Sequence, residues 1–172
     1  MAITRLNTNA FGTSVNLASN VTGTLPAANG GSGRTAVTGN ILQVASATDG
    51  TNRSTSSQTF VTASNGMTIN FTPSSTSSKV LVLLNANIQM TANNTGAVTV
   101  YRDSTNLGSS FGFGVSYATV NMSSGMSACY LDSPNTTSQV TYQTYFRSFD
   151  GNSVNLNGSG NTANLTVMEI AG

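Results

Sequence analysis

Turn sequences interrupt the second two-thirds of the chain at intervals of about ten residues, and this spacing restricts the fold more than any other feature. These turn sequences lie at residues 64–66, 73–78, 93–96, 103–106, 133–135, 150–152 and 157–161, and they include Asn-Gly, Asn-Asn-Thr-Gly, Ser-Pro-Asn and Asp-Gly-Asn. The segments between these turns have the length of strands and are short for helices. Roughly eight to ten strands at such a spacing are typical of an all-β sandwich or barrel.

The longest and most apolar segment, Lys79–Met90, begins with an uninterrupted apolar run at residues 80–84. A half-buried strand alternates apolar and polar side chains, as residues 139–148 do, with Val140, Tyr142, Thr144 and Phe146 on one face. An unbroken run instead predicts burial on both faces. Such burial occurs in the middle of a sandwich or at an interface between subunits.

Uncharged polar residues dominate the composition. Thr, Ser, Asn and Gly make up 88 of the 172 residues, whereas charged residues make up 6% and the net charge is +1. Strong helix formers are scarce, so a helical bundle is not expected. Since the six basic residues are scattered and the apolar runs are short, we expect no nucleic-acid partner and no membrane insertion.

Few side chains could carry catalysis or hold a metal. The chain has no His and one Cys, which excludes a Ser-His-Asp triad and a zinc site of four Cys and His ligands. A glycosidase needs two carboxylates within about 5–10 Å, for which Asp132 with Asp150 is one example. We expect no enzymatic activity and no cofactor, and we retain polysaccharide cleavage as a minor alternative. Cys129 is expected to be a buried core thiol.

The chain divides into two parts near residue 50. Residues 1–49 are poor in apolar side chains and are predicted to form an extended, irregular arm for anchoring and oligomerisation. The alternatives for this arm are a flexible tail and a segment that becomes ordered against neighbouring chains. Residues 50–172 are predicted to form a β-sandwich. The N-terminus has no apolar signal-peptide region, so we expect the protein to leave its host by a route such as a virus particle.

A low-complexity motif in the arm points to such a particle. The sequence Gly-Thr-Leu-Pro-Ala-Ala-Asn-Gly-Gly-Ser-Gly at residues 23–33 resembles a joint that recurs in bacteriophage tail-fibre and related virion proteins, particularly marine and cyanobacterial ones. In that family the joint connects an anchoring part to the next domain. The resemblance implies an anchoring role for the joint residues Leu25, Pro26, Asn29, Gly30, Gly31 and Gly33.

The rest of the chain resembles the trimeric jelly-roll knobs of the C1q/TNF type. The similarity lies in residues 71–82, in residues 98–108 and in the closing segment at residues 165–170. It implies an antiparallel, jelly-roll-like β-sandwich and a homotrimer about a three-fold axis. It also implies that a common set of residues lies in the core or the trimer interface: Val80, Val82, Leu84, Val167 and Ile170.

An aromatic and Gly-rich segment is the candidate host-contact surface. Phe111, Phe113 and Tyr117 either meet a host surface glycan or protein, or line one core face of a strand. We therefore expect a phage virion structural protein, a short trimeric fibre or knob bound to other virion proteins. The alternative is a capsid decoration (cement) protein that stabilises the head, and the minor alternative is a polysaccharide-degrading tailspike.

Overall fold

The computed structural model describes residues 38–172 with the exception of residue 64, and within them it contains twelve strands and two short 3-10 turns. Residues 1–37 lie outside this description, and with them the joint residues. The strands are β1 (Ile41–Asp49), β2 (Arg53–Thr55), β3 (Val61–Thr62), β4 (Thr68–Phe71), β5 (Lys79–Met90), β6 (Asn94–Arg102), β7 (Thr105–Asn106), β8 (Gly114–Ala118), β9 (Met122–Asp132), β10 (Val140–Ser148), β11 (Val154–Leu156) and β12 (Ala163–Ile170). The 3-10 turns are Asn65–Met67 and Gly158–Gly160.

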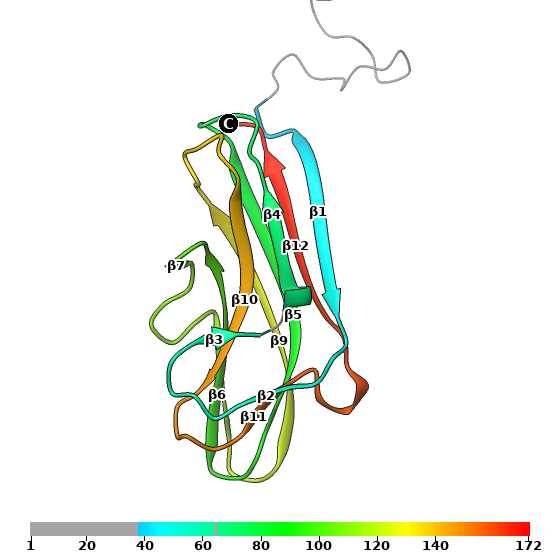
Figure 1. Cartoon of the computed structure of the whole chain (residues 1–172), viewed down its shortest axis with the longest axis vertical. Coiled ribbons are helices and arrows are strands. Elements are labelled where there is room, and N and C mark those ends of the chain that lie inside the picture. Colours follow the sequence, from blue (N-terminus) through cyan, green and yellow to red (C-terminus); the bar gives the residue numbers. More distant parts are fainter. Residues whose placement is uncertain (1–37, 64) are drawn as a thin grey trace, which may run out of the picture. The chain divides into compact units, whose positions relative to one another are not determined.

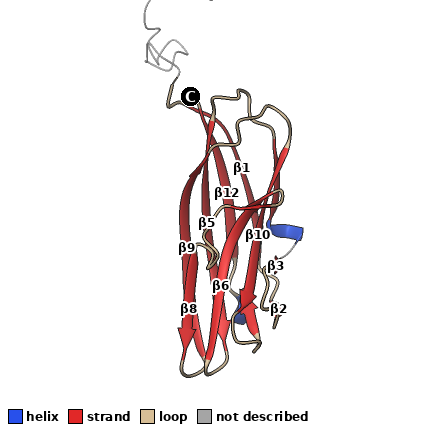
Figure 2. Ribbon diagram, turned by 90° about the vertical axis from the view of Figure 1, so that its left-hand side faces the viewer, coloured by secondary structure: helices blue, strands red, loops and turns tan. Residues whose placement is uncertain are grey.

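The strands form two antiparallel sheets packed face to face (Figures 1 and 2). Sheet A has the order β1-β12-β5-β9, and β11 and β2 continue it beside the far end of β5. Sheet B has the order β10-β6-β8, with β3 and β4 on the free edge of β10 and β7 beside the end of β6. Each sheet combines strands from the start, middle and end of the described chain, as in a jelly roll. The predicted all-β sandwich is confirmed.

The core lies between the two sheets and is built from every second residue of the long strands. In β5 the even-numbered residues from Val80 to Met90 are buried, and in β10 the same holds for Val140, Tyr142 and Phe146. Val80, Val82, Leu84 and Val167 therefore belong to the core. They do not lie at an external surface.

Three features of the chain differ from the sequence-based expectation. Residues 41–49, predicted as part of the arm, form β1 and pair with β12 along its whole length. Asn-Gly is a strong sequence signal for a hairpin, but the Asn65-Gly66 turn does not close one, because β3 and β4 both pair with β10 instead of with each other. Cys129 is exposed, because it falls at an odd-numbered, outward position of β9.

Candidate functional site: the outer face of sheet A

The outer face of sheet A carries apolar side chains in register across four strands. Val44 of β1 lies opposite Met168 of β12, which lies opposite Leu81 of β5, which lies opposite Leu131 of β9. These strands are far apart in sequence, so only the strand register brings the four side chains into one row. The row crosses the full width of the sheet.

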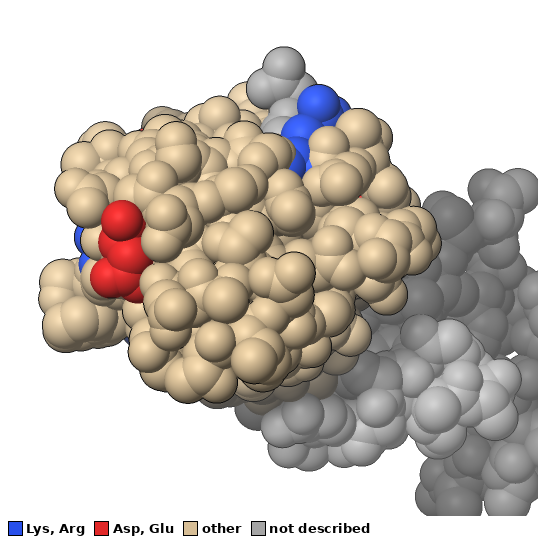
Figure 3. Space-filling model, turned by 90° about the horizontal axis from the view of Figure 1, so that it is seen from below, with Lys and Arg blue, Asp and Glu red and all other residues tan. Residues whose placement is uncertain are grey.

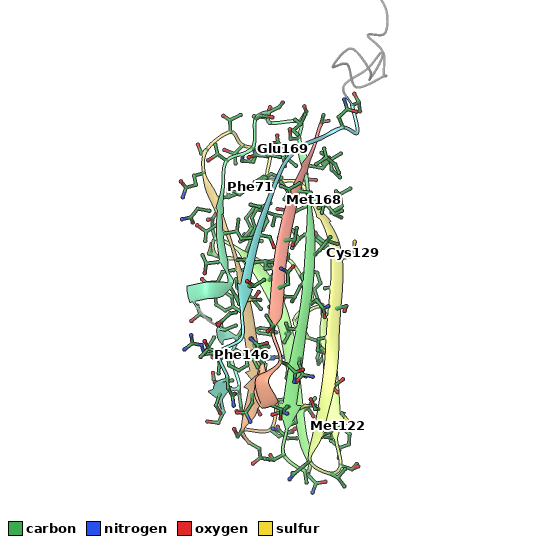
Figure 4. All side chains as sticks on the ribbon, turned by 90° about the vertical axis from the view of Figure 1, so that its right-hand side faces the viewer. Phe71, Met122, Cys129, Phe146, Met168 and Glu169 are labelled. Carbon is green, nitrogen blue, oxygen red and sulfur yellow. The ribbon has the colours of Figure 1, made fainter. Side chains whose placement is uncertain are left out.

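Neighbouring rows extend this apolar area on both sides of the central row. Ile41 lies opposite Ile170 on one side of the row, and Leu83 lies opposite Cys129 on the other. Figure 4 labels Met168 on β12 and Cys129 on β9, and it shows Cys129 directed away from the sandwich. We call this surface the apolar face and define it by seven residues: Ile41, Val44, Leu81, Leu83, Leu131, Met168 and Ile170.

The apolar face is open to solvent in the single chain. Ile41 is 60% exposed, Val44 56% and Leu131 53%, and the adjoining Leu42 is 47% exposed. An antiparallel sheet that faces water normally has polar residues on that side. A contiguous apolar area on the surface marks an interaction site or an aggregation liability. In the apolar run at residues 80–84, the even-numbered side chains thus pack in the core and the odd-numbered ones lie on the apolar face.

The other half of the same outer face is polar. Thr48, Asn164, Asn85 and Ser127 form a row across the same four strands. Their side chains bond one another and their neighbours: Asn164 Nδ2 donates to Ser46 Oγ at 2.9 Å, and Thr166 Oγ1 donates to Asn164 Oδ1 at 2.8 Å. These amides and hydroxyls therefore serve as hydrogen-bond partners for one another. The face is therefore graded, apolar at one end and polar at the other.

The apolar end is also the end at which the chain enters the sandwich. Gly39 N donates to the carbonyl oxygen of Ala171 at 2.6 Å, and Ala171 N donates to that of Asn40 at 2.8 Å. Both ends of the described chain are thus tied together beside Ile41 and Ile170, and the C-terminus lies at this end in Figure 1. Any partner that covers the apolar face lies next to the point where the preceding residues join.

A buried carboxylate lies behind this end of the sheet. Glu169 of β12 faces inward and is fully buried, and it accepts hydrogen bonds from Ser74 N at 2.7 Å, Ser74 Oγ at 2.6 Å and Gln43 Nε2 at 2.6 Å. Burial raises the pKa of this carboxyl, but the hydrogen bonds from Ser74 and Gln43 outweigh it and lower the pKa to about 2. The ionised Glu169 therefore holds β1 and the loop before β5 onto β12.

The charged groups are few, and several of them pair within the sandwich. Arg102 and Asp132 form an ion pair between the sheets, and burial together with the bond to Asp132 raises the pKa of Tyr142 well above its ordinary value. Viewed from the end opposite the C-terminus, charged side chains occupy small parts of the surface (Figure 3). Among the described residues, no group of three or more His, Cys, Asp or Glu residues could hold a metal ion.

The structure separates the residues predicted to form a host-contact surface. Phe111 and Tyr117 are each 59% exposed, on the side of sheet B. Phe113 instead packs against the core, with its ring centroid 5.5 Å from that of Tyr130. The position of Phe113 fits the alternative that it lines the core, and the host-contact prediction stays untested. Of the residues predicted for the core or the interface, Ile170 is the one that lies on the apolar face.

The example carboxylate pair does not form a site. Asp150 accepts a hydrogen bond from Thr95 N at the start of β6, whereas Asp132 binds Arg102 at the end of that strand. Seven residues of extended chain separate the two positions by about 20 Å, which is too far for a glycosidase pair.

Comparison with known proteins identifies no relative, so the functional conclusion rests on the geometry of the sandwich and its surfaces. No protein-family model matches the sequence, and no curated protein matches it. In residues 38–172, apart from residue 64, no helix is long and apolar enough to cross a membrane.

Proposed function

We propose that this protein is a structural protein of a bacteriophage particle, a short homotrimeric fibre or knob. Its N-terminal residues attach it to other virion proteins, and the β-sandwich is the head that meets the host surface. The observation that carries this proposal is the apolar face of sheet A at the end where the N-terminal residues join. The tail-fibre-like joint at residues 23–33 supports the virion assignment.

The gradient on sheet A favours one kind of assembly. If copies are related by an axis parallel to the strands, apolar rows meet apolar rows and polar rows meet polar rows. Such an axis also brings the N-terminal segments of all copies to the same end, as anchoring to a particle requires. A two-fold axis perpendicular to the strands would instead direct these segments to opposite ends. Three-fold symmetry itself rests on the resemblance to C1q/TNF-type knobs.

The first test is the oligomeric state of the full chain in solution. We expect a trimer at micromolar concentration by native mass spectrometry or light scattering. Leu81→Glu and Met168→Glu each place a charge in the middle of the apolar face and should shift the protein to monomers. Thr119→Glu is the control, because Thr119 is exposed in the turn between β8 and β9, away from the outer face of sheet A, and this substitution should leave the trimer intact. A monomeric wild-type protein would contradict the proposal.

The second test is the position and number of copies on the particle. Antibody labelling of phage particles should place the protein at the tail or at a vertex, with a few dozen copies or fewer. Hundreds of copies spread over the head would favour the capsid decoration protein. Absence from purified particles would refute both versions.

A further inference from the structure

A chain of ring–ring and guanidinium–ring contacts lies on the outer face of sheet B. Phe111 stacks on Phe149 with the ring centroids 5.6 Å apart and the planes 19° from parallel. The guanidinium of Arg147 lies 3.8 Å from the centroid of Phe149 on one side and 4.7 Å from that of Phe60 on the other. Phe60 meets Tyr101 edge to face with the centroids 6.3 Å apart, and Tyr101 meets Tyr145 in a tilted contact at 4.2 Å. We call these six side chains the aromatic platform.

Arg147 fixes the platform in place. Its Nη1 donates to the carbonyl oxygen of Gln58 at 3.2 Å, and its Nη2 donates to that of Ser110 at 2.9 Å. The first bond holds the segment that carries Phe60, and the second holds the loop that carries Phe111. Because guanidinium–ring contacts add to these bonds, the exposed rings are ordered before any ligand arrives. Arg147 is a positioning residue, because its guanidinium interacts with two carbonyl oxygens and two aromatic rings of the protein itself.

One end of the platform is open and has polar groups beside it. Phe111 and Tyr117 are each 59% exposed. Tyr117 lies opposite Thr95 in the neighbouring strand, and Phe149 N donates to the carbonyl oxygen of that same Thr95. Asp150 is exposed and accepts the hydrogen bond from Thr95 N at 2.7 Å. Exposed rings, a threonine and a carboxylate therefore meet within one small area.

We propose that this end of the platform binds an uncharged saccharide. A sugar ring has apolar C–H faces that pack on aromatic rings, and hydroxyl groups that donate hydrogen bonds to a carboxylate such as Asp150. The charges at the site select against acidic sugars, because Asp150 is an anion and Arg147 is already engaged by two carbonyl groups. The head of the proposed fibre would thus bind neutral saccharides of the host surface, which rests on the proposed function.

The test is binding of the full-length protein to a panel of immobilised and soluble oligosaccharides. The panel contains neutral hexose and N-acetylhexosamine oligomers together with sialylated oligosaccharides and oligouronates. We expect binding among the neutral members, and binding about tenfold weaker for Phe111→Ala and for Tyr117→Ala, which corresponds to the loss of one ring contact. Val120→Ala is the control, because Val120 is 66% exposed and lies outside the platform. Failure of the wild-type protein to bind any neutral member would overturn the inference.

Asp150→Asn tests the role of charge. Asparagine still offers an oxygen to Thr95 N, so the turn is expected to persist while the negative charge is lost. The affinity of the variant for acidic saccharides should then lie closer to its affinity for neutral ones than it does in the wild-type protein. If the wild-type protein prefers acidic saccharides, the assignment of ligand class is wrong.

Two controls separate this inference from the proposed function. In the first, the protein is trimeric and present on phage particles but still attaches to cells whose surface glycans have been removed. This result would overturn the saccharide site and leave the proposed function intact. Loss of that attachment on protease treatment of the cells would identify a protein receptor instead. If the protein binds saccharides but is absent from phage particles, the saccharide site stands and the proposed function is overturned.

Discussion

The carboxylate of Asp132 on β9 lies against the guanidinium of Arg102 on β6, with Arg102 Nη1 at 2.6 and 2.7 Å from its two oxygens. The ion pair joins sheet A to sheet B. The hydroxyl of Tyr142 donates a third hydrogen bond to Asp132, at 2.8 Å. The Asp132 side chain is 6% exposed and that of Arg102 is 20% exposed, so water compensates little for the loss of either partner.

Removing the charge of Asp132 should therefore destabilise the sandwich. Asp132→Asn leaves a largely buried guanidinium without its counter-ion, and we expect a loss of about 2–3 kcal/mol after allowance for the partial exposure of Arg102. Urea denaturation measures this change. Asp103→Asn is the matched control, because Asn keeps an acceptor for Thr141 N and tolerates the positive φ of 51° at that position. Equal effects of the two substitutions would argue against the ion pair as a clamp.

The buried Glu169 predicts a defined loss of stability in acid. Its pKa is about 2 in the folded protein and about 4.5 when the chain is unfolded, so the unfolded state binds the proton more readily. The stabilisation is fully present above pH 4.5 and is lost as the pH falls toward 2. The shift corresponds to about 3 kcal/mol.

The measurement is the free energy of unfolding of the wild type and of Glu169→Gln at several pH values. At pH 7 the variant should be less stable, and the difference between the two proteins should shrink between pH 4.5 and pH 2. Other carboxylates contribute equally to both curves and cancel in the difference. A difference that stays constant down to pH 2 would show that Glu169 is not the titrating group.

Two strand glycines differ in the space around them and so offer a matched pair of substitutions. A Cβ on Gly96 of β6 would lie 2.8 Å from Ile88 Cδ1 and 3.1 Å from Val154 Cγ1, whereas a Cβ on Gly125 of β9 meets nothing within 4 Å. Gly96→Ala should cost about 1–3 kcal/mol through overpacking of the core. Gly125→Ala should be neutral or slightly stabilising. Thermal unfolding distinguishes the two, and a harmless Gly96→Ala would mean that the core yields there.

The sequence predicts the strands whose side chains follow a simple rule. Lys79–Met90 has the predicted bounds, and the alternation at residues 139–148 gives the correct buried face of β10. The start of β6 is missed, because Asn94, Thr95 and Gly96 have the composition of a turn. Their place in the strand depends on tertiary contacts: Asn94 accepts a hydrogen bond from Ser148 Oγ, and Gly96 faces Ile88 and Val154.

The sequence predicts part of the candidate interface on the apolar face. The unbroken run at residues 80–84 predicts a second apolar side for β5, and that side is present at Leu81 and Leu83. The extent of the apolar face could not be predicted, because it depends on the pairing of Val44, Met168 and Leu131 with β5 across long stretches of sequence. The role of Arg147 in the aromatic platform is hidden for the same reason, since its partners come from separate loops.

The boundary of the sandwich leads to a final prediction about shortened chains. β1 pairs with β12 over the whole of Ala163–Ile170, Ala45 and Ala47 pack against the core, and Gln43 bonds Glu169. A chain that begins at Thr38 keeps all of these contacts, whereas one that begins at Gly50 loses them and leaves β12 as an unpaired edge. We expect residues 38–172 to fold cooperatively, and residues 50–172 to melt roughly 10 °C or more lower, which corresponds to about 3 kcal/mol. Circular dichroism at matched protein concentration measures both transitions. Equal melting temperatures would restore the boundary at residue 50 and make β1 an accessory to the fold.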